Sequence, residues 1–149
     1  MFCFLLLLGT HTYAQAPTTP SSNLNISNID GDRFRISYTR GDGSNRIIVA
    51  RANDPVTAIP QNGVDYLAAP FGEGNEIAPG QFVVFEGTSS SPTITGLSPS
   101  TTYHFRVYEF NGTNFNTQYL TSSFLSGSAS TVSAPSTQAS NIAFSNVTG

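Results

Sequence analysis

The sequence contains little charge and very few of the residues that build disulfide-linked or catalytic proteins. Its 149 residues include one cysteine, no tryptophan, two histidines and six basic residues, all of them arginine. A single cysteine cannot form an intrachain disulfide, so a folded domain must be stabilised by its core alone. The net charge of −3 and the scattered arginines provide no basic patch, so we expect no nucleic-acid partner.

No apolar run is long enough to span a membrane. The longest, Phe2–Leu8, is far shorter than the roughly 20 residues that a membrane helix needs. The tripeptide Thr12-Tyr13-Ala14 follows it and places small residues at the −3 and −1 positions of a signal-peptidase site. The sequence therefore predicts a cleaved signal peptide over 1–14, no membrane span, and a secreted, extracellular or cell-surface location.

The beginning of the predicted mature chain is repeated at its end. Ala16–Gly31 and Ala134–Gly149 share Ala-Pro, a threonine, two Ser-Asn pairs and the final glycine in register. Self-similarity of this kind indicates a repeated structural unit. We predict one complete domain over 15–132 and the truncated start of a second repeat over 133–149, cut from a tandem array.

Between these segments the sequence has the period of β-strands, with glycine, proline, asparagine and serine at the boundaries. Phe34, Ile36 and Tyr38 share one face of a strand, whereas Arg46–Ala52 and Gln81–Glu86 are apolar on both faces. This pattern predicts an all-β, two-sheet antiparallel sandwich of about seven strands. The strands are expected at 23–29, 33–39, 46–52, 81–86, 92–97, 102–110 and 119–131.

The segment Asn53–Gly80 is unusually long for a connection and contains four prolines. Connections of this length are usually functional or form small elements of their own. Because the neighbouring strands are apolar on both faces, we predict that the segment folds back over one face of a sheet. A ligand-binding lid is the alternative.

The stretch Leu97–Gly112 carries the corner of such a sandwich. Leu97 is expected to fill the core, Pro99 to turn the chain, and the Tyr103 hydroxyl to bond backbone at the corner. Together with Phe34–Thr39, this stretch resembles the corner and strands of a fibronectin type III domain.

The finer pattern is similar to the fibronectin type III repeats of secreted and surface proteins of Bacteroidetes-type bacteria. It consists of Tyr38–Gly43, Thr101–Gly112 and the opening Ala134–Asn141. The resemblance implies a fibronectin type III or immunoglobulin-like sandwich that acts as a non-enzymatic spacer or adhesion module.

Two kinds of short motif are interpreted as turns. Arg40-Gly41-Asp42 is the tripeptide with which some animal fibronectin type III domains bind integrins, but here it lies between the second and third predicted strands. We expect Gly41 and Gly43 to supply positive φ in that turn. Asp30–Asp32 and Asp42–Asn45 lack the downstream glutamate of a calcium loop, so we predict hairpin turns and no metal site.

No set of residues predicts an enzyme. His104 and Glu109 are five residues apart on one predicted strand, so their side chains face opposite sheet surfaces. Glu109 has the inward parity and is expected near the end of the strand, with water or an arginine as partner. A G-x-S-x-G motif is absent, and we predict no catalytic residue and no cofactor.

The predicted outward face of 102–110 is the best candidate for a binding surface. His104, Arg106, Tyr108 and Phe110 would form an aromatic and basic stripe that can stack on a sugar ring or a partner side chain. The alternative is that 53–80 or the next repeat buries the stripe. Exposure of these side chains distinguishes the two interpretations.

The sequence as a whole predicts a non-catalytic spacer or scaffold within a larger secreted or cell-surface protein. Its partners would be the neighbouring domains of the same polypeptide. Two alternatives are an adhesion module that binds an extracellular glycan or protein through the stripe, and an accessory domain of a secreted hydrolase. Fold analogy does not decide among them.

Overall fold

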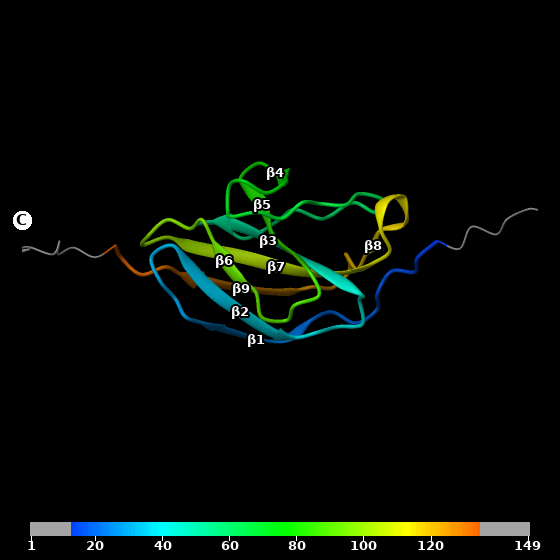
Figure 1. The fold of residues 1–149 in the computed structure, drawn as a ribbon, viewed down its shortest axis with the longest axis horizontal. Coiled ribbons are helices and arrows are strands. Elements are labelled where there is room, and N and C mark those ends of the chain that lie inside the picture. Colours follow the sequence, from blue (N-terminus) through cyan, green and yellow to red (C-terminus); the bar gives the residue numbers. More distant parts are fainter. Residues whose placement is uncertain (1–12, 135–149) are drawn as a thin grey trace, which may run out of the picture.

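The computed structural model describes residues 13–134, which form two antiparallel β-sheets packed face to face (Figure 1). The smaller sheet has the order β1-β2-β6, and the larger has the order β4-β5-β3-β7-β8, with β9 also paired to β7. The elements are β1 (Ser22–Ser27), β2 (Arg33–Thr39), β3 (Asn45–Ala52), β4 (Glu76–Ala78), β5 (Gln81–Gly87), β6 (Thr93–Thr95), β7 (Thr102–Asn111), the 3₁₀ turn η1 (Asn114–Asn116), β8 (Gln118–Tyr119) and β9 (Leu125–Ser130).

The all-β sandwich predicted from the sequence is confirmed, with two differences in its strands. The described residues contain nine strands because the 53–80 segment contributes β4 and because the predicted strand 119–131 is divided into β8 and β9. These two short strands pair with opposite ends of β7. The signal peptide predicted over 1–14 lies almost wholly outside the described residues, as does the second repeat predicted over 133–149.

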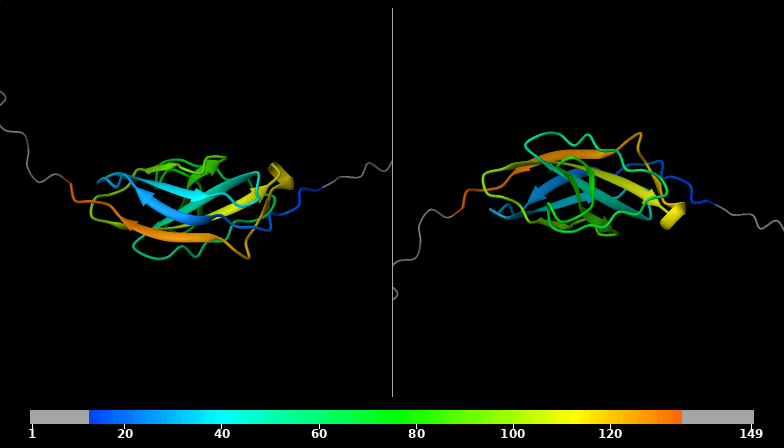
Figure 2. Two further views of the ribbon diagram at one scale, coloured as in Figure 1. Left: turned by 90° about the horizontal axis from the view of Figure 1, so that it is seen from below. Right: turned by 90° about the horizontal axis from the view of Figure 1, so that it is seen from above.

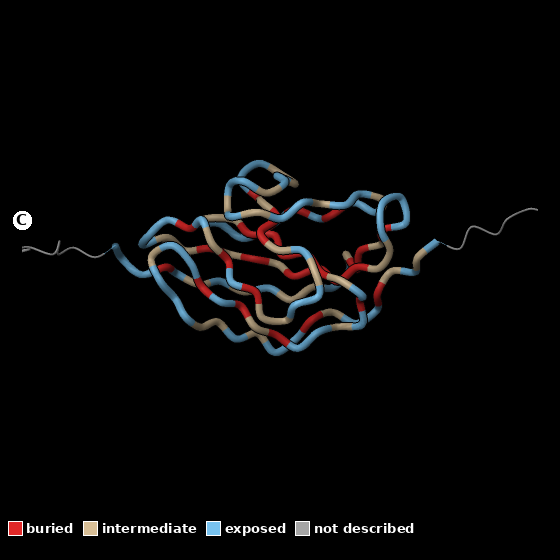
Figure 3. The backbone as a smooth tube through the Cα atoms, viewed as in Figure 1, coloured by how far each residue is buried: buried red, intermediate tan, exposed pale blue. Residues whose placement is uncertain are grey.

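The main core fills the space between the sheets. Phe34, Ile36 and Tyr38 of β2 are buried on the single face that their alternation predicts, and they meet Phe105 and Val107 of β7. The rings of Phe34 and Phe105 are 6.2 Å apart between centroids. Figure 3 shows buried backbone running along the central strands of both sheets.

A second apolar cluster lies on the outer face of the larger sheet. Ile47 and Val49 of β3 are completely buried there because the 53–80 segment crosses over them with Val56 and Ala58. The expectation that this segment folds over one sheet face is therefore confirmed. Figure 2 shows the segment running along the outside of the sheet, in the views from below and above.

One buried amide attaches the 53–80 segment to the sheet. The Gln81 carboxamide oxygen accepts hydrogen bonds from Thr57 N at 2.7 Å and Ala58 N at 2.8 Å, while its Nε2 donates to Thr57 Oγ1 at 2.9 Å. Every polar group of that side chain therefore has a partner, as a buried amide requires. The segment is bonded to the sheet as well as packed against it.

The corner before β7 is closed by the three residues expected there. Leu97 is buried and its N–H donates to Asp32 O at 3.1 Å, while the chain turns through Pro99. The Tyr103 hydroxyl accepts a hydrogen bond from Ser98 N at 2.9 Å. The tyrosine therefore joins the main core to the backbone of the corner, as in other sandwiches of this kind.

Candidate functional site

The candidate binding stripe on β7 is divided into a covered half and an open half. Tyr108 and Phe110 are buried, with 0% and 5% of their surface exposed, while His104 and Arg106 remain partly exposed. Of the two interpretations left open by the sequence, burial under the 53–80 segment therefore holds for the two aromatic members. Both side chains lie on the outer face of the larger sheet, as predicted, but the 53–80 segment covers that part of the face.

Tyr108 is held by the segment that covers it. Its hydroxyl donates to Ala58 O at 2.8 Å and accepts from Arg106 Nη1 at 3.3 Å. Burial raises the pKa of the Tyr108 phenol, and the adjacent Arg106 only partly opposes this effect. Tyr108 therefore contributes to the attachment of 53–80 and cannot stack on a sugar.

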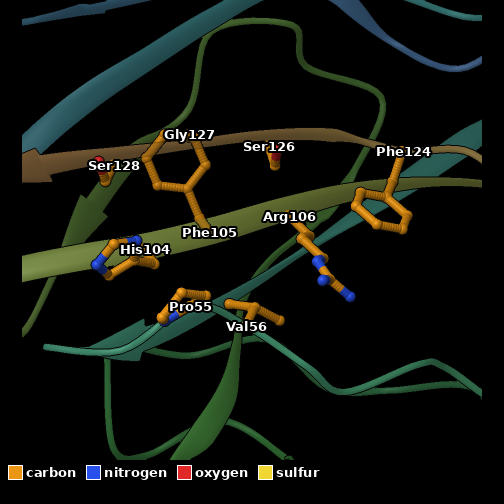
Figure 4. A pocket seen from close by; sticks show the side chains of 9 residues that line it. All are labelled: Pro55, Val56, His104, Phe105, Arg106, Phe124, Ser126, Gly127 and Ser128. Carbon is orange, nitrogen blue, oxygen red and sulfur yellow. The ribbon is translucent and has the colours of Figure 1, made fainter.

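The open half of the stripe forms the floor of a groove of about 250 Å³. Figure 4 shows His104 and Arg106 on β7, with Pro55 and Val56 on one side and Ser126 and Ser128 of β9 on the other. The Arg106 guanidinium carbon lies 4.1 Å from the centroid of the Phe124 ring. Such a stacking contact fixes the direction of a long side chain without neutralising its charge.

The charge of this groove is uncompensated. Its lining residues include no carboxylate, and within residues 13–134 Arg106 forms no salt bridge. The nearby Arg51 pairs with Asp54 at 3.5 Å and donates to Pro55 O. Arg106 is therefore the residue that gives the groove its positive character, and the groove suits an anionic group better than an apolar one.

Glu109 lies apart from His104 and takes part in a buried ion pair. Arg46 of β3 is its direct cross-strand neighbour, with Arg46 Nη2 at 3.2 Å from Glu109 Oε2 and both side chains fully buried. Arg46 also donates to Thr88 O and Gly43 O. Of the two partners expected for Glu109, the structure places an arginine there. His104 lines the groove and Glu109 does not, so the two side chains are kept apart as their spacing along the strand predicted.

Carboxylates bind the segment that precedes β1, residues 15–21, which we call the N-terminal segment. Glu109 Oε1 accepts hydrogen bonds from Ser21 Oγ and from Gly41 N. Asp42 accepts from Thr18 N at 3.0 Å, Thr18 Oγ1 at 2.7 Å and Thr19 N at 2.9 Å. The Arg-Gly-Asp tripeptide thus lies in the connection between β2 and β3, and its aspartate binds its own chain. The hairpin predicted at Asp42–Asn45 is wrong, because β2 and β3 belong to different sheets and the chain crosses here from one sheet to the other.

The two glycines of this turn have a different role from the one expected. Neither Gly41 nor Gly43 has positive φ, so that expectation is wrong. Both are required by close approach instead, because a Cβ on Gly41 would overlap Thr19 O and a Cβ on Gly43 would lie 2.6 Å from Glu109 Oε2. The absence of side chains here makes room for the N-terminal segment and for the ion pair.

We expect Asp42→Asn to loosen the N-terminal segment without unfolding the sandwich. Hydrogen bonds from Thr19 and Thr18 hold the pKa of Asp42 below its ordinary value. The stabilisation by this carboxylate is therefore complete above the ordinary aspartate pKa and is lost as the pH falls through the lowered one. Amide hydrogen exchange of Thr18 and Thr19 should be faster in the variant at neutral pH and equal in both proteins at acidic pH.

The matched control for this experiment is Asp30→Asn, in the turn before β2. The Asp30 carboxylate accepts a hydrogen bond from the adjacent Gly31 N and does not contact the N-terminal segment. The Asp30→Asn substitution should therefore leave the amide exchange of Thr18 and Thr19 unchanged. Equal protection of these amides in Asp42→Asn and in the unaltered chain would show that other contacts hold the segment.

A second cavity, of about 180 Å³, lies where the 53–80 segment meets the end of β7. Asp65, Tyr66, Glu86 and Tyr119 contribute to its lining. The Asp65 carboxylate already accepts hydrogen bonds from Asn114 N and from Thr117 Oγ1. This cavity was not predictable from the sequence, because its walls come from well-separated parts of the chain.

Neither the predicted turns nor the rest of residues 13–134 gathers three or more residues that could hold a metal ion. Asp32 is instead paired with Arg33 at 2.8 Å on the surface. Among the same residues, no helix has the length and apolar character needed to cross a membrane.

No protein-family model and no curated protein matches this chain. Among the solved structures that resemble it in fold are two β-sandwich domains. One, from a computer-based redesign of a β-sandwich protein, is 19% identical, with a TM-score of 0.53 over 82% of this chain and 98% of that one. The other, a human FNIII domain, is 13% identical, with a TM-score of 0.50 over 89% and 95% of the two chains. With the two sheets and the tyrosine corner, these likenesses show that the chain has a fibronectin type III-like β-sandwich fold.

Proposed function

We propose that this chain is a non-catalytic spacer or scaffold module in a larger secreted or cell-surface protein. The observation that carries the proposal is the position of its ends. The two ends of the described chain, blue and orange in Figure 1, lie at opposite ends of the sandwich along its longest axis. Modules of this shape, joined end to end, form an extended array and hold other domains apart.

The bound N-terminal segment supports the same function. A spacer separates other domains best when its linkers do not collapse, and here the residues that lead into the domain are hydrogen-bonded to Asp42, Glu109 and Asn111. The repeated opening Ala134–Gly149 suggests that a following module would have a similar linker. The apolar segment Phe2–Leu8 supports export.

The adhesion alternative depended on an exposed aromatic stripe on β7. Tyr108 and Phe110 are buried, so stacking of a glycan on an aromatic stripe is not supported. No feature of residues 13–134 favours an accessory role beside a hydrolase over a spacer. Domains with this fold are generally non-catalytic, which agrees with the proposal.

Small-angle X-ray scattering of a tandem protein tests the spacer function. The full chain is compared with a protein in which a second copy, beginning at Ala16, follows Ser133 of the first. We expect the largest dimension of the tandem to be about twice that of the single module. A tandem whose two modules fold back side by side, with a largest dimension close to that of one module, would overturn the proposal.

A further inference from the structure

Strand β9 is an edge of the larger sheet, and although Leu24 of β1 packs against it at Gly127, its free backbone groups lack the usual protection. It pairs only with β7 among the described strands, and its sequence from Leu125 to Ser130 contains neither proline nor charge. The other edges are less available, because β4, β6 and β8 have three residues or fewer and β1 is irregular between Ser22 and Asn25. Native proteins usually blunt a regular free edge, because it can pair with another chain.

The register of β9 shows which of its backbone groups are free. Thr131 N donates to Thr101 O at 3.0 Å, so the alternation of an antiparallel ladder turns the odd-numbered residues of β9 toward β7. The N–H and C=O groups of Ser126, Ser128 and Ser130 therefore face away from the sheet. All three serines are exposed.

The groove described above lies beside this edge, on the face that the serine side chains share. Ser128 is the cross-strand neighbour of His104, and Ser126 is that of Arg106. Serine is short, so a longer side chain on an added strand can pass over it and reach the next strand. The group it meets there is the Arg106 guanidinium, which has no carboxylate partner within residues 13–134.

We propose that the edge of β9 and the groove together bind an extended acidic segment of a partner protein by strand addition. The partner backbone would pair with Ser126, Ser128 and Ser130, and its aspartate or glutamate side chains would bind Arg106 beside His104. Main-chain pairing supplies affinity and the charged groove supplies selectivity. This inference adds a recognition function to the proposed spacer and does not depend on it.

The free edge favours a peptide over an acidic glycan. A row of alternating N–H and C=O groups is complementary to another extended backbone, which a glycan lacks. The aromatic rings near the groove also provide no open stacking surface, because Phe124 is occupied by Arg106 and Tyr108 is buried.

The test uses the full chain and a fluorescent heptapeptide of alternating valine and glutamate, with glutamates at positions two, four and six. Binding is measured by fluorescence anisotropy and located by amide chemical shifts. We expect a Kd below about 1 mM, shifts concentrated at Ser126, Ser128 and Ser130, and no binding of the matching valine–lysine peptide. Arg106→Gln should weaken binding by about 10-fold or more, as expected for loss of a charge-assisted hydrogen bond.

Two controls separate strand addition from simple charge attraction. Arg35→Gln removes an exposed arginine from the smaller sheet and should leave the Kd unchanged. A valine–glutamate peptide N-methylated on the residues that pair with β9 should not bind, although its charge is the same. The proposal is wrong if the unmodified peptide fails to bind, if the N-methylated peptide or polygalacturonate binds equally well, or if Arg106→Gln has no effect.

Discussion

Glu109→Ala should lower the free energy of unfolding by about 3–5 kcal/mol, a large part of the roughly 5–15 kcal/mol that stabilises a typical domain. The substitution leaves the Arg46 guanidinium completely buried without a counter-charge. It also removes the acceptor of Ser21 Oγ and Gly41 N, which join the N-terminal segment and the β2–β3 turn to the core. Urea unfolding followed by circular dichroism measures the loss, since the chain has no tryptophan.

Two further variants show whether an uncompensated charge is the cause. Arg46→Met combined with Glu109→Leu removes both charges and should be more stable than Glu109→Ala, because no buried charge is left without a partner. Asp32→Asn breaks the exposed ion pair with Arg33 and should cause no measurable loss. If Glu109→Ala were as stable as the unaltered chain, water would have to reach Arg46, and the buried pair would be contradicted.

The two-sheet architecture was predictable because alternation is a local property of the sequence. Phe34, Ile36 and Tyr38 recur with period two and are buried on one face of β2. The division of the last strand was not predictable in this way. After Leu120 the chain leaves β7 and returns at Leu125, and Phe124 lies over Arg106 in between. The break between β8 and β9 depends on a contact between distant segments, and the periodicity of the sequence carries no information about such contacts.

The coverage of the binding stripe shows the same limit. The spacing of His104, Arg106, Tyr108 and Phe110 predicted their common face but not how far the 53–80 segment extends over it. That segment has no periodicity of its own, so the position of Val56 and Ala58 over Tyr108 and Phe110 is decided by packing. The useful signal was indirect: strand β3 is apolar on both faces and therefore needed a cover on its outer side.

The buried ion pair left a signal that sequence reasoning used only in part. Arg46 begins a run of completely buried residues in β3, and Glu109 lies between buried aromatic residues near the end of β7. Charged residues in such strands are rarely buried unless they are paired. The inward parity of Glu109 indicated an arginine as one option, but the choice of Arg46 required the β3–β7 register.

Gly41→Ala should destabilise the domain by about 1–3 kcal/mol, the usual cost of forcing extra atoms into a packed site. The backbone at Gly41 suits any residue, since its φ is not positive. The new Cβ, however, would overlap Thr19 O and lie 2.8 Å from Pro20 C, both of them backbone atoms of the N-terminal segment. That segment must therefore move, and Thr18 and Thr19 should lose their protection against amide exchange.

Gly31→Ala is the matched control, because Gly31 also precedes an aspartate in a turn and also lacks positive φ. A Cβ there would meet Pro99 Cγ and Val132 O at 3.6 Å, which is ordinary contact, so stability should change by no more than about 0.5 kcal/mol. A loss of stability in Gly41→Ala alone, with faster amide exchange at Thr18 and Thr19, would show that Gly41 is needed for the N-terminal segment to pack against this connection. Equal, small effects of both substitutions would mean that the N-terminal segment is not bound against this turn in solution. The bound N-terminal segment would then no longer support the spacer function.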